Sequence, residues 1–445
     1  MSAVNCDCLF DNQWPYAPIL TNIRLKTMNN LFLVILFLSI TSVAKAKNVV
    51  ISTAENVGMS TERLKNLDRM GDRYVADGNY SGLVTLIARK GKIVHFKAHG
   101  NVGVDNDTPM ETDTLFRIYS MTKPVTAIAA MILYEQGKFH LNDPVSKYLP
   151  QFADLKVLVD GELVAARSPI LMRQLFIHTA GLSYGSNPDD PVDIEYQKAQ
   201  LLQAGSLDAF IAKLAKLPLR YQPGERYHYS VSVDLLGAVI EKLAGLPLDQ
   251  FFKQRIFQPL QMNDTFFQLP SSKKQRLASD QYWDAHANTI AVMPAGQSRC
   301  YDDVGLFMGG GGLISTAYDY FRFSQMVLNG GELDGVRLLG PKTVELLASN
   351  HMTDTVRSVG KHDLYAGQSM ALGYGVVTDP ALMPATSSKG ELSWAGFAGT
   401  KFWIDPQEEL IGIGLVQLYR SPFPLRFDLK VGAYQALTKL NKNPN

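Results

Sequence analysis

The sequence predicts an α/β (α+β) protein in which strands from both ends of the chain build one sheet and the segment between them forms a helical lobe. Three observations favour this fold class. A hairpin pattern occupies residues 83–98, a series of strand patterns occupies residues 373–416, and helical patterns dominate between them. A sheet built from both ends of a chain carries the helical segment as an insertion.

The individual elements follow from hydrophobic spacing and turn residues. Apolar residues recur at helical spacing over 61–75, and the alternating segments 83–88 and 93–98 flank the turn residues 89–92. Residues 141–168 look rich in loops and 265–300 look irregular. Outside these stretches we expect helices at 171–177, 207–217, 233–244, 251–257, 316–328, 341–349 and 429–440, and strands at 373–377, 392–395, 400–404 and 410–416.

Length and composition indicate a large globular protein. Its 445 residues, 46% hydrophobic and 19% charged, suffice for a large core and two lobes or domains. A net charge of +1 gives no reason to expect nucleic acid or an acidic partner. No His-Glu-x-x-His motif occurs, and His95 and His99 in the hairpin are interpreted as packed or solvated. We therefore expect no metal and no cofactor.

Residues 28–46 have the layout of a secretory signal peptide. Met28 precedes an apolar run, 31–40, that is too short for a comfortable membrane span. The small-residue site Ala44-Lys45-Ala46 follows the run. Residues 1–27 are then an extension upstream of the true start. We expect a secreted or periplasmic protein, with an uncleaved membrane anchor as the alternative.

Cleavage after Ala46 leaves residues 47–445 as the mature chain. It removes Cys6 and Cys8 and retains Cys300, which has no partner for an internal disulfide. We therefore expect the mature protein to be stabilised by its hydrophobic core.

A serine and a lysine at the start of a buried helix form the strongest chemical signal. Ser120 and Lys123 lie three residues apart, and the chain from Pro124 to Leu133 is almost wholly apolar, as in a helix buried on all sides. Positions i and i+3 share a helix face, so the hydroxyl and the amine can approach each other. A serine needs an adjacent base to become a nucleophile, and a buried lysine amine can supply it. The alternative is a serine that only caps the helix.

Other segments imitate a nucleophile motif. Ser-x-x-Lys also occurs at 42–45, 271–274 and 358–361, without a buried-helix context. Gly181-Leu-Ser183-Tyr-Gly185 matches the nucleophile elbow, which requires a strand before the serine and a helix after it. A helix-like segment precedes Ser183, and the following Ser-Asn-Pro-Asp-Asp-Pro is not expected to begin a regular helix promptly. We interpret this pentapeptide as a turn.

Two later segments carry further candidate groups. Tyr229 lies just before the helix at 233–244, where a loop could present its phenol to a site for proton transfer. Ordinary packing of a half-buried aromatic is the alternative. Residues 393–400 place small residues between two strands, where the backbone can approach a ligand. A backbone N–H there and that of Ser120 would form an oxyanion hole, with a simple hairpin turn as the alternative.

Together, three segments resemble the motifs of serine β-lactamase-like hydrolases. Ser120-Met-Thr-Lys123, Tyr229-Ser-Val231 and Trp394-Ala395-Gly396 occur in the order of those motifs. The similarity is closest to the class C β-lactamase-related carboxylesterases, or family VIII esterases, and covers roughly residues 55–435. Flanking segments agree with it, namely 114–118, 178–182, 235–241 and 311–316.

This resemblance implies a β-lactamase/transpeptidase-like fold, with an antiparallel sheet flanked by helices and an all-helical lobe. The sheet lobe would span about 55–118 and 305–440, and the helical lobe about 119–304. The resemblance implies that Ser120 is the nucleophile and that Lys123 and Tyr229 share the role of general base. The remaining implied groups are the oxyanion-hole N–H groups of Ser120 and Phe397 and the substrate-binding residues Trp394, Ala395, Gly396 and Val231.

Two departures from the β-lactamase pattern favour esters. The second motif of those enzymes ends in Asn, whereas Val231 has no amide to bind a substrate. Their third motif begins with Lys, a cation that faces the antibiotic carboxylate, whereas this chain has Trp394. Losing a charge-assisted hydrogen bond costs about 1.5–3 kcal/mol, roughly ten- to a hundredfold in binding. A neutral ester would need neither contact, and Trp394 would offer it an aromatic wall.

The predicted function is that of a secreted serine hydrolase that cleaves small carboxylic esters through an acyl-Ser120 intermediate. A β-lactamase, a D-amino-acid peptidase or a transacylase on the same fold are the alternatives. An alternative of another class is a non-catalytic, penicillin-binding-like sensor of acylated or peptidoglycan ligands. The expected partner is a small ester or acyl substrate, without nucleic acid and without stable membrane insertion after signal cleavage.

Overall fold

The computed structural model describes residues 50–294, 301–353, 356 and 364–441. The signal peptide, the upstream extension and the three cysteines lie outside these residues. Within the described part, no helix is both long and apolar enough to cross a membrane.

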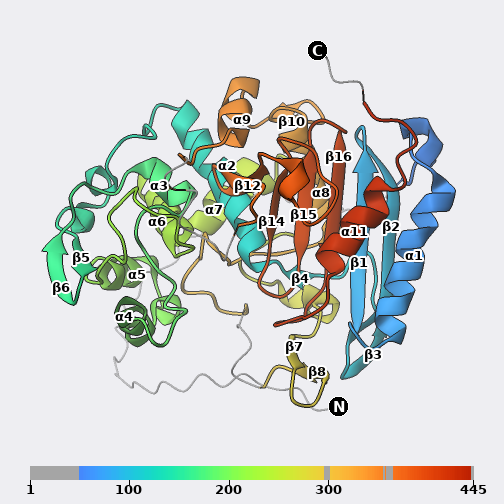
Figure 1. The fold of residues 1–445 in the computed structure, drawn as a ribbon, viewed down its shortest axis with the longest axis horizontal. Coiled ribbons are helices and arrows are strands. Elements are labelled where there is room, and N and C mark those ends of the chain that lie inside the picture. Colours follow the sequence, from blue (N-terminus) through green and yellow to red (C-terminus); the bar gives the residue numbers. More distant parts are fainter. Residues whose placement is uncertain (1–49, 295–300, 354–355, 357–363, 442–445) are drawn as a thin grey trace, which may run out of the picture. The chain divides into compact units, whose positions relative to one another are not determined.

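One antiparallel sheet of eight strands joins the two ends of the chain. Its order is β12-β13-β14-β15-β16-β1-β2-β3, so that β1 lies beside β16, with Val84 opposite Leu415. Figure 1 shows the blue N-terminal strands beside the red C-terminal ones. The strands are β1 (Gly82–Arg89), β2 (Lys92–Gly103), β3 (Asn106–Pro109), β12 (Gln368–Ala371), β13 (Tyr374–Val377), β14 (Leu392–Ala395), β15 (Lys401–Asp405) and β16 (Leu410–Leu415). This arrangement confirms the predicted fold class.

Helices cover both faces of this sheet. Phe402 of β15 packs against Tyr320 of α8 (Ala317–Leu328), with ring centroids 4.8 Å apart. The next residue, Trp403, stacks on Tyr434 of α11 (Leu425–Tyr434). Successive side chains of a strand point to opposite faces, so α8 and α11 lie on opposite sides of the sheet. The helix α1 (Thr61–Ala76) packs beside α11.

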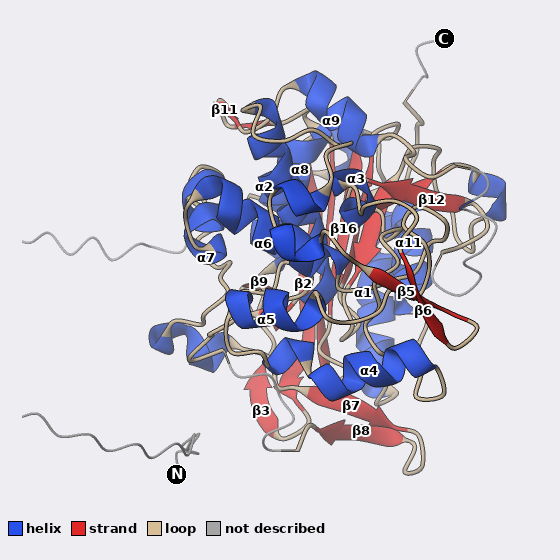
Figure 2. Ribbon diagram, turned by 90° about the vertical axis from the view of Figure 1, so that its left-hand side faces the viewer, coloured by secondary structure: helices blue, strands red, loops and turns tan. Residues whose placement is uncertain are grey.

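The segment between the two halves of the sheet is mainly helical (Figure 2). Its central helix is α2 (Thr122–Glu135), in which every residue from Thr122 to Leu133 is buried, as the apolar run predicted. Around it lie α3 (Met172–Phe176), α4 (Pro191–Ala199), α5 (Leu207–Leu214), α6 (Ser232–Ala244) and α7 (Leu248–Phe252), the last continued by a π-helical turn, Lys253–Phe257. After α8 the chain adds a small hairpin of β10 (Glu332–Leu333) and β11 (Val336–Arg337), and then α9 (Pro341–Ala348).

Several details differ from the sequence-based expectation. The two stretches expected to be irregular, 141–168 and 265–300, each contain a hairpin. These are β5 (Lys156–Val159) with β6 (Glu162–Ala165), and β7 (Gln281–Asp284) with β8 (Thr289–Val292). The strand β12 was also not predicted. The helix α4 begins directly at Pro191, against expectation. The Asp190 side chain accepts hydrogen bonds from the N–H groups of Val192 and Asp193, and a first-turn proline needs no donor. A proline-rich start is therefore compatible with a helix when an aspartate caps it.

The last helix also differs from its predicted span of 429–440. It begins at Leu425 and ends at Tyr434. Beyond it, the Ser60 N–H donates to the carbonyl of Ala436 and the Thr438 N–H donates to that of Gly58. Pairing with the segment before α1 thus takes the place of further helix.

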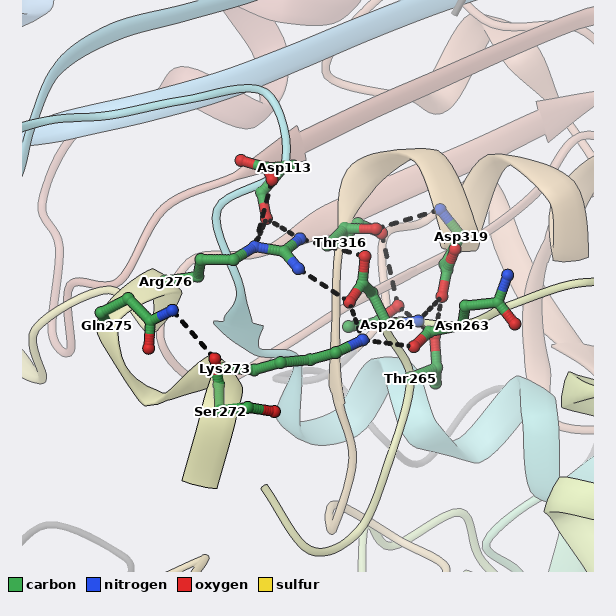
Figure 3. Close-up of polar contacts among 11 residues, drawn as sticks. Asp113, Asn263, Asp264, Thr265, Ser272, Lys273, Gln275, Arg276, Thr316 and Asp319 are labelled. Carbon is green, nitrogen blue, oxygen red and sulfur yellow. Dashed lines mark hydrogen bonds and ion pairs between the residues drawn. The ribbon is translucent and has the colours of Figure 1, made fainter. Parts of the chain in front are cut away.

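A polar cluster holds the start of α8 (Figure 3). The Thr316 hydroxyl caps the helix by accepting from the Asp319 N–H, as predicted. The Asp319 carboxylate accepts from the Asp264 N–H at 2.7 Å and from the Thr265 hydroxyl at 2.9 Å. The carboxylate of Asp264 pairs in turn with Lys273 and Arg276. Burial raises the pKa of Asp319 to about 7, although these hydrogen bonds favour its ionised form.

Candidate active site

Ser120 lies at the junction between the sheet and the central helix. The strand β4 (Phe116–Arg117), paired with β9 (Ile314–Ser315), leads into a 3₁₀ turn, Tyr119–Met121, and then into α2. Tyr119 has a φ of 43°, which is strained for a non-glycine residue. This kink turns the half-buried Ser120 side chain into a cavity.

The structure brings the three predicted catalytic residues together. The Lys123 Nζ lies 3.1 Å from the Ser120 Oγ, and the Tyr229 hydroxyl donates to the same Oγ at 2.7 Å. The ammonium also lies 4.7 Å from the centroid of the Tyr229 ring. Lys123 is 1% exposed. A hydroxyl between two groups that can exchange protons is arranged for activation as a nucleophile.

A second tyrosine, which the sequence argument missed, holds Lys123. The Lys123 Nζ donates to the Tyr184 hydroxyl at 3.1 Å and to the Gly310 carbonyl at 2.7 Å. Tyr184 donates to Asp234 at 3.3 Å, and Asp234 accepts from the Gly310 N–H at 2.8 Å. Burial and the charge of Asp234 raise the pKa of Tyr184 well above its usual value, so this phenol stays protonated. Tyr184 therefore positions Lys123 and does not act as a base.

A buried histidine orders the other side of the site. The His178 ring lies 4.6 Å from the Tyr229 ring and stacks on Trp394, with centroids 6.4 Å apart. Its Nδ1 accepts from the Ser230 N–H. Burial, and then the charge of Lys123, hold the pKa of His178 well below its usual range, so the ring is neutral. In the sequence, His178 was noted only as part of a flanking segment.

The third motif lies at the end of β14, against the serine turn. A Cβ added to Gly396 would stand 2.4 Å from the Ile118 carbonyl oxygen, so only glycine allows this approach. The Gly396 N–H donates to the Thr400 carbonyl, which closes the turn. Among the described residues, nothing accepts a hydrogen bond from the Phe397 N–H. The Phe397 side chain is 67% exposed, with its ring 6.3 Å from that of Tyr119.

A cavity of about 540 Å³ joins these groups. Ser120, Tyr229, Trp394, Ala395 and Gly396 all line it, as does Phe397. Its other lining residues are Tyr227, Leu364, Tyr365, Gln368, Met383, Pro384, Ala385, Glu391, Ser393, Lys401, Phe402, Trp403, Arg426, Phe427 and Lys430.

Val231 is not among the residues that line this cavity, and its role as a substrate-binding residue stays a prediction. It is 1% exposed and forms the N-cap position of α6. Tyr229 points to Ser120 from the loop before the helix, and Val231 packs into the core two residues later. Val231 thus differs from the β-lactamase asparagine in having no amide to offer a substrate.

Ser183 lies in a loop, is 1% exposed and does not line the cavity. It donates to Asp193 at 2.5 Å and lies 3.2 Å from His228 Nε2. In a serine hydrolase triad the histidine stands between serine and carboxylate, whereas here the serine stands between the other two. Its hydroxyl also accepts from the Gly185 N–H. This cluster stabilises the loop before α4.

Comparison with known proteins agrees with this geometry. The profile of the Beta-lactamase family matches residues 67–436. The chain belongs to that family. The protein Rv1367c of Mycobacterium tuberculosis (strain H37Rv) is 36% identical over 78% of this chain and 88% of its own length. Esterase EstB of Burkholderia gladioli is 28% identical over 83% of this chain and 94% of its own length.

A similar solved structure is EstCE1, described as a hydrolase with promiscuous acyltransferase activity. It has a TM-score of 0.72 and 28% identity, and the match covers 85% of this chain and 99% of EstCE1. The protein is therefore a serine hydrolase with the β-lactamase fold and with esterase and carboxypeptidase relatives.

Proposed function

We propose that this serine hydrolase cleaves small carboxylic esters through an acyl-Ser120 intermediate. The observation that carries the proposal is the convergence of Lys123 and Tyr229 on the Ser120 Oγ, in a cavity where Trp394 takes the place of the β-lactamase lysine. The esterase relatives support the same substrate class.

The proposed reaction has two balanced halves. The Ser120 Oγ bonds to the ester carbonyl carbon while one of the pair, Lys123 as its neutral amine or Tyr229 as its phenolate, accepts the hydroxyl proton. The N–H groups of Ser120 and Phe397 hold the oxyanion. The intermediate collapses, and the alcohol leaves with a proton from the same pair. Water then attacks the acyl carbon and gives one proton to the same base. The acyl–Oγ bond breaks, the acid leaves, and that proton passes to Oγ to restore the Ser120 hydroxyl.

The test compares p-nitrophenyl butyrate and nitrocefin hydrolysis by the wild type, Ser120→Ala and Ser183→Ala. We expect the butyrate ester to be the better substrate and Ser120→Ala to lose about a thousandfold or more in kcat. Ser183→Ala, which alters a hydroxyl outside the cavity, should retain hydrolysis. Faster turnover of nitrocefin would make the protein a β-lactamase, and loss of activity only in Ser183→Ala would refute the site.

The same proposal includes export to a secreted or periplasmic location, which the layout of residues 28–46 supports. Cell fractionation with N-terminal sequencing of the mature protein tests it, and a start at Lys47 is expected from cleavage after Ala46. A fluorophosphonate probe separates an enzyme from a non-catalytic sensor, because only an activated Ser120 should be labelled covalently.

A further inference from the structure

The cavity continues past Ser120 to a second group of polar side chains. Lys401 of β15 lies opposite Ala395 in the ladder between β14 and β15, and both line the cavity. The Lys401 stem runs over Gly414 of β16 towards the face that α11 covers, where Arg426 also lines the cavity. Figure 1 shows α11 in front of this part of the sheet. The same cavity therefore extends from Ser120 to the basic side chains of Lys401 and Arg426.

Basic side chains outnumber acidic ones in the lining of this end of the cavity. Of the charged lining residues, Glu391 and Lys430 form a 2.6 Å ion pair and cancel. Arg426, which is exposed to solvent, donates to the Tyr365 hydroxyl at 2.8 Å. Lys401 is 8% exposed, and among the described residues its Nζ forms no hydrogen bond or ion pair. Lys401 and Arg426 thus have no carboxylate partner among the described residues that line the cavity.

An isolated buried ammonium is costly, so a buried lysine amine without a partner loses its proton more readily than an exposed one. Burial, and then the charge of Arg426, lower the pKa of Lys401 well below its usual value, and Asp428 opposes this only in part. Asp428 is engaged with the Tyr74 hydroxyl at 2.6 Å and does not line the cavity. A ligand anion would supply the missing counter-charge.

We propose that the end of the cavity at Lys401 and Arg426 is a subsite for a carboxylate carried by the substrate. This inference rests on the proposed ester hydrolysis and narrows the substrate class to esters with an anionic end. Neither residue belongs to the three sequence motifs. The lysine supplies a point charge and the guanidinium a planar donor pair, and both recognise carboxylates. The neighbouring Phe427 and Trp403 offer apolar walls for the connecting chain.

The test uses esters that differ only in a terminal carboxylate. Mono-p-nitrophenyl adipate, pimelate and suberate are compared with p-nitrophenyl hexanoate, heptanoate and octanoate, which place the charge on the acyl side. The ester 4-butyryloxybenzoate is compared with phenyl butyrate, which places it on the alcohol side. The proteins are the wild type, Lys401→Met, Arg426→Met and the control Lys389→Met, an exposed lysine outside the cavity.

We expect Lys401→Met to lower kcat/KM for at least one carboxylate ester about ten- to a hundredfold and to leave its neutral counterpart within twofold. Arg426→Met should act in the same direction, and Lys389→Met should change neither ester. Equal effects on charged and neutral esters in every pair would overturn the subsite while the proposed function stands.

Thermal unfolding provides a readout that does not depend on turnover. Suberate should raise the melting temperature of the wild type and of Ser120→Ala, but not that of Lys401→Met. If no ester is hydrolysed but this shift is observed, the proposed function fails and the subsite holds; without the shift, the subsite fails too. Lys401→Met alone should melt at or above the wild-type temperature, since it replaces a buried amine that has no partner by an apolar side chain of similar length. A lower melting temperature would mark Lys401 as structural and overturn the proposal.

Discussion

Lys123 donates hydrogen bonds to three oxygens, and these contacts fix how the site can work. The acceptors are the Ser120 hydroxyl, the Tyr184 hydroxyl and the Gly310 carbonyl. Tyr184 in turn donates a hydrogen bond to Asp234, so a buried carboxylate is connected to the lysine through one phenol. The position of the Lys123 amine in the site therefore depends on Tyr184 as much as on the Ser-x-x-Lys spacing.

Replacement of Tyr184 by phenylalanine tests this role. The change removes an acceptor from Lys123 and a donor from Asp234 while keeping the ring. A hydrogen bond to a charged group contributes about 1.5–3 kcal/mol, so kcat/KM for p-nitrophenyl butyrate should fall about ten- to a hundredfold, mainly through kcat. The matched control is Tyr374→Phe, because no described residue bonds the buried Tyr374 hydroxyl. Undiminished activity of Tyr184→Phe would show that Lys123 needs no such support.

At the scale of elements, the helices α2 and α8 have different starts. The helix α2 has no side-chain cap, and its first turn is placed by the kink at Tyr119 and by the close approach of Gly396. The helix α8 has a Thr316 cap and the buried Asp319 in its first turn. The active site is thus built on the start of α2, which has no side-chain cap. The capped start of α8 instead holds the loop at 263–276 (Figure 3).

The stability of the α8 start should depend on pH. The pKa of Asp319 is about 7 in the folded protein, against 3.8 ordinarily, so folding favours its protonated form. Its contribution is fully present below about pH 4 and is lost as the pH rises through 7. The free energy of unfolding, measured in urea, should therefore fall between pH 5 and pH 8 in the wild type and fall less in Asp319→Asn.

The comparison between variants isolates this residue. Burial also raises the pKa of Glu391 to about 7, which adds the same trend to both proteins. Asn at position 319 keeps an acceptor for the Asp264 N–H and Thr265. Parallel pH profiles for the two proteins would contradict the assignment.

At the scale of the whole molecule, a buried ion pair joins the two ends of the chain. The Arg89 guanidinium at the end of β1 pairs with Glu408 at 2.7 Å, and both side chains are almost fully buried. Arg89 also donates to the carbonyls of Val57 and Gly58, while the Asn441 N–H donates to Glu408. The pair thus secures the segment before α1, the edge of β1, the turn before β16 and the C-terminal segment at one point.

Breaking this pair should destabilise the protein without changing its chemistry. Arg89→Met leaves the buried Glu408 carboxylate without its cationic partner, which costs about 3–5 kcal/mol in the free energy of unfolding. The double variant Arg89→Met/Glu408→Gln should recover part of that loss. Lys65→Met, which breaks the exposed pair with Glu62, should change stability little. Urea unfolding measures all three, and ester hydrolysis by the folded fraction should stay unchanged. Equal stabilities for Arg89→Met and Lys65→Met would refute the role of the pair.

Local patterns in the sequence determined the regular elements of this protein. Hydrophobic spacing predicted α1, the β1–β2 hairpin, α6, α8 and the strands β13 to β16, because each pattern repeats within a single element. The all-apolar run placed α2 in the interior, and spacing of three put Ser120 and Lys123 on one face of the helix start. The short hairpins and the start of α4 were not predicted, because they depend on side-chain caps and strand pairing more than on the weak hydrophobic patterns of those segments.

Tertiary structure alone decided which of these residues meet. Tyr229 is 109 residues from Ser120 in the chain, and their 2.7 Å hydrogen bond exists because the loop before α6 packs against the start of α2. No periodic pattern in the sequence predicts the hydrogen bond from Tyr184 to Asp234. The same holds for the positions of Val231 and Ser183 outside the cavity and of Lys401 in its lining. Periodicity reports the face of one element, whereas a site depends on how faces of distant elements pack together.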